Sequence, residues 1–367
     1  MRVLTKSRFK LGLECPNKLF YTKKDEYPDS KSIDPFLKAL AQGGFQVEEL
    51  ARMHYPNGIV IEGNDWDYKL LWEQTQELLA QENVVIFEAA FLFDGLFVRT
   101  DILVKEGNRI ELIEVKSKSF DPTDDFLFVG RRGGMAASWK PYLFDIAFQK
   151  FVMQACFQEW KIKSYMMMAD KSKHASIDGL NQLFRISKKG EGRTGIIKKV
   201  SSLEETGDSV LGRKEVTEIV NDIEANKFMY YDNLSFQESI KLFKEKYEKD
   251  EYFGWPTSYR ACKECEFTCS KEELSQGKKS GFRECFTKQH HWTDKDFEKP
   301  NTFDIYNFRK GSDLFDKGII FKSDLNEEII GLKEEASKLS TSHRQWLQID
   351  KEIKNDASIY VDKEGLK

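Results

Sequence analysis

Three consecutive apolar segments constrain the fold more than any other feature of this sequence. They cover residues 84–93, 96–104 and 109–115, and the two junctions between them read Asp94-Gly95 and Glu106-Gly107-Asn108. Asp-Gly and Gly-Asn pairs readily adopt the backbone angles of tight hairpin turns, so each junction predicts a reversal of the chain. We therefore expect an antiparallel meander of three strands.

Helical patterns lie on both sides of this meander. Apolar residues recur three and four positions apart over residues 35–54 and 66–81, and again over 141–159, where Pro141 takes the first turn. A further apolar run at 162–168 predicts another strand. The order helices, three strands, helix, strand favours an α/β core with a mixed sheet flanked by helices.

Length and composition set the outer limits. The chain has 367 residues, 40% of them apolar and 32% charged, which is typical of a soluble globular protein with about two domains. We expect a core over residues 1–170, a helical and cysteine-rich segment over 171–300, and a charged C-terminal extension over 301–367. We interpret this extension as a linker to a missing domain.

The location expected for the chain is cytoplasmic. The N-terminal segment is basic but lacks the apolar stretch that a signal peptide requires. No apolar run in the sequence approaches the ~20 residues of a membrane span. In a reducing compartment the six cysteines are expected to serve metal binding rather than disulfides.

Two carboxylates and a lysine are expected to meet at one end of the meander. Glu114 and Lys116 alternate onto the same face of the third strand, and the hairpin brings Asp101 of the second strand close to Glu114. Carboxylate oxygens suit Mg²⁺ or Mn²⁺, and a lysine can orient or deprotonate an attacking water. The alternative is a surface ion pair, which the apolar flanking residues disfavour.

The residues around this group resemble the RecB-like branch of the PD-(D/E)XK nucleases. The likeness lies in Phe87–Phe91, Arg99–Leu103, Leu112–Ser117 and the helical segment Asp145–Gln149. The chain is most similar to the CRISPR-associated iron–sulfur exonuclease and to uncharacterised relatives that carry a C-terminal ribonuclease-H-like domain. The resemblance implies a restriction-endonuclease-like sheet and metal-dependent hydrolysis of DNA. It favours single-strand exonuclease action in phage defence or repair.

The resemblance and the local pattern together give a set of candidate site residues. The expected catalytic residues are Asp101, Glu114, Lys116 and Gln149; the expected Mg²⁺ or Mn²⁺ ligands are Asp101, Glu114, Val115, Glu48 and Glu88; the expected nucleic-acid contacts are Arg131, Arg132 and Lys118. The chain departs from the family at two positions. Met153 stands where a tyrosine is usual, and Glu48 falls near the place of a metal-binding histidine.

The cysteines form a second group with ligand-like spacing. Cys262 and Cys265 form a C-x2-C pair that is followed by Cys269 and Cys285. Read locally, these four thiolates predict a structural zinc site. The family resemblance instead implies a [4Fe–4S] cluster held by Cys15, Cys262, Cys265 and Cys285. Cys269 is then a spare thiol, or the fourth ligand in place of Cys285.

A function of another class stays open at this stage. The chain could be a non-catalytic iron–sulfur or zinc module that binds nucleic acid within a larger defence or repair complex. The departures at Met153 and Glu48 favour it. In either case the expected partner is nucleic acid, DNA before RNA, alongside protein partners or a missing C-terminal nuclease domain.

Overall fold

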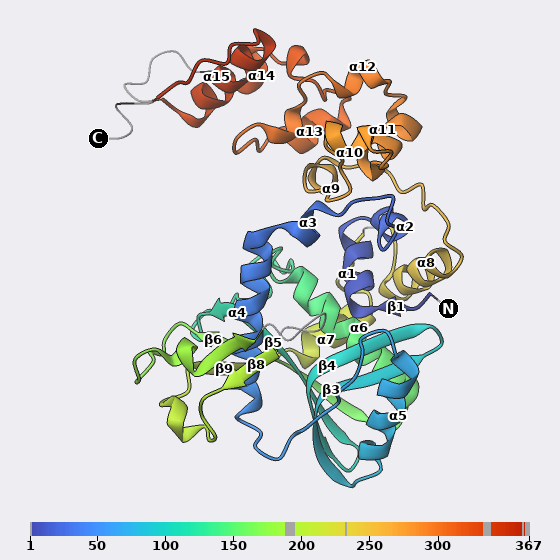
Figure 1. Cartoon of the computed structure of the whole chain (residues 1–367), viewed down its shortest axis with the longest axis vertical. Helices are drawn as coiled ribbons and strands as arrows, with labels where there is room; N and C mark the ends of the chain where they lie inside the picture. The colour runs from blue at the N-terminus through green and yellow to red at the C-terminus, as the bar shows by residue number, and fades with distance from the viewer. Residues whose placement is uncertain (1, 188–194, 232, 333–338, 362, 364–367) are drawn as a thin grey trace. The chain divides into compact units, whose positions relative to one another are not determined.

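The computed structural model describes residues 2–187, 195–231, 233–332, 339–361 and 363. It divides the chain into two compact units (Figure 1). The first consists of residues 1–20 and 31–253, and the second of residues 21–30 and 254–367.

A mixed sheet of seven strands forms the centre of the first unit. Its strands are β1 (Leu4–Thr5), β2 (Ile59–Val60), β3 (Asn83–Phe93), β4 (Leu96–Glu106), β5 (Arg109–Phe120), β6 (Lys161–Asp170) and β9 (Leu211–Glu215). The order is β2-β3-β4-β5-β6-β9, and β1 pairs with β4. Neighbours from β3 to β5 are antiparallel, whereas β6 runs parallel to β5. The predicted meander and the α/β class with a mixed sheet are confirmed.

Helices cover both faces of this sheet. The helices of the unit are α1 (Lys6–Glu14), α4 (Pro35–Arg52), α5 (Tyr68–Leu79), α6 (Lys140–Cys156), α7 (Thr217–Glu224) and α8 (Phe236–Glu248). One face packs against α1, α5, α6, α7 and α8. The other face packs against α4 and the hairpin of β7 (Phe184–Ser187) and β8 (Gly195–Lys198). The two short helices α2 (Lys18–Tyr21) and α3 (Ser30–Ile33) lie where the chain passes between the units.

Helix α1 is fixed against α6 by an aromatic stack. Thr5 caps its N-terminus, because the Thr5 side chain accepts a hydrogen bond from the Arg8 N–H. The ring of Phe9 lies 4.3 Å from that of Phe148 in α6, and both side chains are fully buried. Lys6, the first residue of the helix, therefore has a defined place beside the central strands.

The second unit is built from short helices around its own apolar core. Its helices are α9 (Tyr259–Lys263), α10 (Lys271–Ser275), α11 (Gly281–His290), α12 (Asp294–Phe297), α13 (Gly311–Asp316), α14 (Glu327–Ile330) and α15 (Thr341–Ile353). Phe286, Trp292 and Ile349 belong to this core. Residues 21–30 join the unit through side chains such as Tyr27, whose hydroxyl donates to Glu284 Oε1 over 2.6 Å.

The boundaries of these two units differ from the boundaries of the three predicted segments. The break expected at residue 170 is bridged, because β9 pairs with β6 and α7 packs on α6. In the described part of the segment 301–367, Ile349 lies in the same core as Phe286, which a separate extension would not do. None of the helices in the described part of the chain has the length and apolar character to cross a membrane.

Candidate active site

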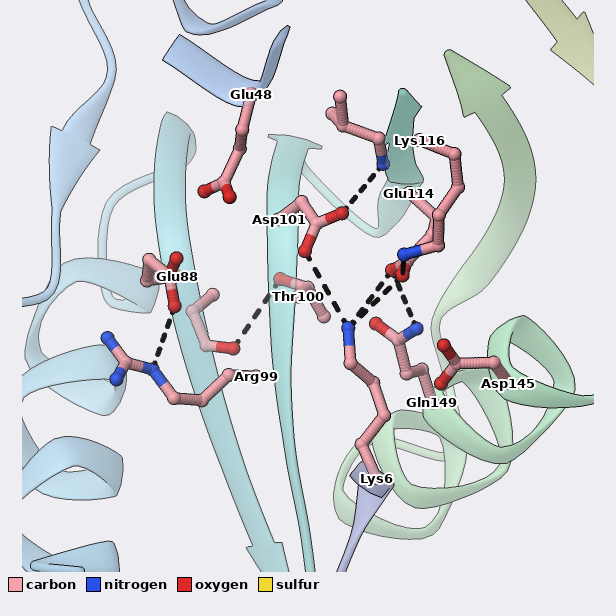
Figure 2. A network of polar contacts seen from close by, with 12 residues as sticks. Lys6, Glu48, Glu88, Arg99, Thr100, Asp101, Glu114, Lys116, Asp145 and Gln149 are labelled. Carbon is pink, nitrogen blue, oxygen red and sulfur yellow. Dashed lines mark hydrogen bonds and ion pairs between the residues drawn. The ribbon is translucent and has the colours of Figure 1, made fainter. Parts of the chain in front are cut away.

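Three carboxylates stand in one row across β3, β4 and β5. The pairing of β3 with β4 passes over Glu88 and Asp101, which lie opposite each other. The pairing of β4 with β5 ends at Ile102 and Ile113, one step before Asp101 and Glu114. The hydrogen-bond ladder is thus open where the carboxylates gather (Figure 2). Open ladder positions give side chains room to approach one another.

Two of these carboxylates converge on a single ammonium group. The Nζ atom of Lys6 lies 3.2 Å from each oxygen of Glu114 and 3.6 Å from Oδ1 of Asp101. Asp101 Oδ2 accepts a hydrogen bond of 2.7 Å from the N–H of Val115. The Glu114 side chain is fully buried, and that of Asp101 is 16% exposed. Two carboxylates that share one cation are close enough to share a metal ion.

Lys116 and Gln149 complete the environment of Glu114. Lys116 Nζ donates to Glu114 Oε1, as expected for residues two apart on one strand face. Gln149 of α6 donates from Nε2 to Glu114 Oε2 over 2.8 Å. Glu114 therefore has donors from α1, β5 and α6, and the structure brings together the four residues expected to be catalytic.

Burial and the surrounding charges shift the pKa values of Glu114 and Asp101 in opposite directions. Burial opposes ionisation of Glu114, but Lys116 and Lys6 outweigh it and hold the pKa of Glu114 well below its usual range. Burial and the charge of Glu114 raise the pKa of Asp101 to about 6, against the effect of Lys6. Glu114 is thus the permanent anion of the pair.

Glu88 and Glu48, two further expected metal ligands, are bound by arginines. Arg52 Nη2 lies 2.9 Å from Glu88 Oε1, and Arg99 Nε lies 3.1 Å from Oε2. Arg52 also pairs with Glu48. Burial and the charge of Asp101 raise the pKa of Glu48 to about 8 despite Arg52. Both carboxyl groups lie near Asp101 but have cationic partners of their own.

An open cavity adjoins these arginine-bound carboxylates. Its volume is about 290 Å³, and Glu48, Arg52 and Glu88 line it together with Ile61 and Gly195. It offers space beside the carboxylate row for part of a substrate.

The sequence did not identify two residues of this site, Lys6 and Asp145. Asp145 lies one turn before Gln149 on α6 and is almost completely buried. Within the described part of the chain, neither Asp145 oxygen has a hydrogen-bond partner, nor does Gln149 Oε1. Lys10 Nζ is 3.6 Å from Asp145 Oδ2. The sequence did contain one indication of Lys6, because this residue belongs to a basic N-terminal stretch.

The residues expected to contact nucleic acid lie at and beyond the end of β5. Arg131 and Arg132 are exposed in the connection to α6, with the Arg131 guanidinium 5.1 Å from the Phe126 ring centre. Lys118 Nζ lies 3.8 Å from the centre of the Trp139 ring and donates to a backbone carbonyl. The two arginines are thus accessible to a ligand, whereas Lys118 is partly engaged.

The cysteines are divided between the two units. No disulfide joins any two of them in the described part of the chain. Cys15 follows α1 in the first unit, whereas Cys262 of α9, Cys265 and Cys285 of α11 belong to the second. Cys269 donates from Sγ to a backbone carbonyl over 3.1 Å, and Cys285 is buried. Cys285 Sγ also has a polar contact, with the Tyr21 hydroxyl at 3.5 Å, so these contacts do not choose between Cys269 and Cys285 as the fourth ligand.

Within the described ranges, no three His, Cys, Asp or Glu side chains are arranged as metal ligands. Comparisons with protein-family models, curated proteins and solved structures find no match for the chain. A functional inference therefore depends on the residues of the site and their geometry.

Proposed function

We propose that this chain is a divalent-metal-dependent nuclease of the PD-(D/E)XK type, which hydrolyses phosphodiester bonds of DNA from the end of a single strand. The observation that carries the proposal is the convergence of Asp101 and Glu114 on one cationic position, with Lys116 beside them. The resemblance to RecB-like nucleases supports the choice of reaction.

The donor atoms fit Mg²⁺ or Mn²⁺. Asp101 and Glu114 offer hard carboxylate oxygens, and Gln149 Oε1 is a buried oxygen without a hydrogen-bond partner in the described structure. A bound Mg²⁺ or Mn²⁺ would polarise the scissile phosphate and make a water molecule more acidic. Asp101 and Glu114 would hold the ion, with Glu88 and Glu48 near enough to contribute once released from Arg52.

The remaining residues act on the water and on the substrate. Lys116 carries a positive charge beside Glu114, where it can orient the attacking water and stabilise charge that develops on the phosphate. Gln149 holds the Glu114 carboxylate in one orientation through its amide. Arg131 and Arg132 supply exposed positive charge for the phosphates of the strand.

Substitution of the site residues tests this proposal. We expect Asp101→Asn, Glu114→Gln and Lys116→Met each to lower kcat on end-labelled single-stranded DNA with Mg²⁺ or Mn²⁺ by about 10²-fold or more. Their combined effects should be far from additive, because they belong to one assembly. Glu111→Gln is the matched control, since Glu111 lies on the same strand and pairs with Arg213.

Three outcomes separate the alternatives. Wild-type activity in Glu114→Gln would show that the site is assigned wrongly. Tight DNA binding by the wild-type chain, with no cleavage under any divalent metal, would favour the non-catalytic binding module. Parallel RNA and double-stranded substrates identify the preferred nucleic acid.

For the cysteines we keep the proposal of a [4Fe–4S] cluster held by Cys15, Cys262, Cys265 and Cys285, which rests on the family resemblance. Protein purified without oxygen should then be brown and contain about four irons per chain. Cys15→Ala should lose the iron and melt at a lower temperature, because metal binding and folding are coupled. Cys269→Ala should keep the iron. Colourless protein that holds zinc whether or not Cys15 is present would instead indicate the local zinc site.

A further inference from the structure

Lys6 reaches the carboxylate row from outside the sheet. Strand β1 pairs with β4 at Leu96 and Phe97, and α1 begins directly after β1. The side chain of Lys6 therefore points along β4 to the place where the ladder is open (Figure 2). It is 21% exposed, which leaves its ammonium largely inside the site.

The Lys6 ammonium occupies the position that a shared metal ion would need. It contacts both oxygens of Glu114 and lies within ion-pair distance of Asp101. The arginines of the neighbourhood bind Glu88 and Glu48 instead, and Lys116 contacts Glu114 from its own strand. Lys116 also acts on Asp101 through its charge, but among the described side chains it is Lys6 that lies within ion-pair distance of both candidate ligands. A metal ion that bridged Asp101 and Glu114 would lie very close to this ammonium, and the two positive charges would repel each other.

Asp145 offers a second place for the same ammonium. Its carboxylate lies on α6 one turn from Gln149, beside the site in Figure 2. Neither of its oxygens has a hydrogen-bond partner among the described residues, although the side chain is nearly fully buried. A buried carboxylate without donors is unfavourable, so an ammonium that moved there would gain hydrogen bonds. Lys10 Nζ lies 3.6 Å from Asp145 Oδ2, which is within ion-pair distance but does not supply a hydrogen bond.

We infer that Lys6 is an internal cation of the site, which neutralises Asp101 and Glu114 without metal and moves to Asp145 when a divalent ion binds. The exchange keeps Asp101 and Glu114 compensated in both states, and it gives Asp145 a donor in the metal-bound state. It also sets the affinity for the metal, because each bound ion must displace the ammonium. This inference rests on the proposed metal site and adds to it a residue that controls occupancy.

Metal binding by the full-length chain, without nucleic acid, tests the exchange. Mn²⁺ is titrated calorimetrically into wild type and into Lys6→Met, Lys105→Met and Asp145→Asn. Lys6→Met should bind Mn²⁺ about tenfold more tightly than wild type, the size usual for coupling between two ligands. Lys105→Met, with the same charge change elsewhere on β4, should bind like wild type. Asp145→Asn should bind more weakly, and this loss should vanish in the Lys6→Met background.

The outcomes distinguish the exchange from the site itself. The inference is overturned if Lys6→Met binds Mn²⁺ no more tightly than wild type. It is also overturned if Asp145→Asn still weakens Mn²⁺ binding in the Lys6→Met background. Glu114→Gln is titrated alongside: if it binds Mn²⁺ like wild type, the proposed metal site fails too. Lys6→Gln, which keeps N–H donors, replaces Lys6→Met if the latter does not fold. The same increase in affinity is then required.

Discussion

At the scale of single residues, Glu88 connects the backbone to the site. Its φ angle is +59°, a left-handed conformation that side chains other than glycine adopt only at a cost of roughly 1–2 kcal/mol. The conformation persists because Arg52 and Arg99 bind the carboxylate. It also coincides with the interrupted pairing at Asp101. Strain of this kind concentrates at functional sites, where surrounding contacts maintain it.

This strain predicts an unusual order of stabilities. Glu88→Ala and Glu88→Gly both remove the ion pairs with the arginines, but only glycine relieves the backbone. We expect Glu88→Gly to be more stable than Glu88→Ala by about 1 kcal/mol in urea unfolding.

The control for this comparison is Ala89→Gly on the same strand. At an ordinary strand position glycine is less stable than alanine by roughly 0.5–1 kcal/mol, so Ala89→Gly should destabilise the protein. Equal stability of the two Glu88 variants, or greater stability of Glu88→Ala, would show that the left-handed backbone carries no strain.

At the scale of elements, the site depends on how closely α1 packs on its neighbours. Gly12 lies on the buried side of α1, and a Cβ at this position would stand 2.7 Å from Phe243 and 2.9 Å from Leu19. Both side chains belong to the core, where they have little freedom to move. The absence of a side chain at Gly12 therefore lets α1, which carries Lys6, pack closely on α8 and α2.

Two glycine substitutions separate packing from helix propensity. Replacing glycine by alanine inside a helix usually stabilises it by roughly 1 kcal/mol. Gly43→Ala in α4 should show this gain, since nothing lies within 4 Å of the added carbon. Gly12→Ala should instead destabilise the protein by about 1–3 kcal/mol through overpacking. Thermal or urea unfolding measures both, and a Gly12→Ala protein as stable as Gly43→Ala would contradict the close approach.

The elements with strong local patterns could be predicted from the sequence, and those without could not. The hairpins at Asp94-Gly95 and Gly107-Asn108 and the periodic helices α4, α5 and α6 appear close to their expected bounds. Strand β9 lies in the segment 171–300 that was expected to be helical and cysteine-rich, because its five residues are mostly polar and form a strand only by pairing with β6. The antiparallel pair of β7 and β8 was not expected either, because each strand has only four residues.

The site shows the same division. Asp101, Glu114 and Lys116 could be brought together by hairpin spacing and strand alternation, which are local rules. Gln149 came from the family resemblance. Lys6 contacts Glu114 across 108 residues of sequence, a separation that no periodic pattern covers. Its role follows only from the packing of α1 on the sheet.

At the scale of the whole molecule, Lys322 and helix α15 are structural parts of the second unit. Lys322 is fully buried and forms ion pairs with Asp304 and Glu352. These ion pairs connect η4 (Lys322–Asp324), which contains Lys322, to η3 (Thr302–Asp304) and to α15. Breaking a buried pair leaves an uncompensated charge, which makes such contacts sensitive to the loss of either partner. The unit is therefore expected to fold only with α15 present.

Two isoleucines on α15 test this expectation, because they differ in burial and not in type. Ile349 is fully buried in the core with Phe286, whereas Ile353, one turn later, is 44% exposed. Ile349→Ala should destabilise the second unit by about 2–5 kcal/mol, and Ile353→Ala should change its stability by roughly 0.5 kcal/mol or less. Hydrogen exchange resolved by peptide reports the two units separately, so protection should fall in residues 254–353 and persist in the central sheet. Equal effects of the two substitutions would mean that α15 is not part of this core, and that the segment after residue 301 is the separate extension that its charge suggested.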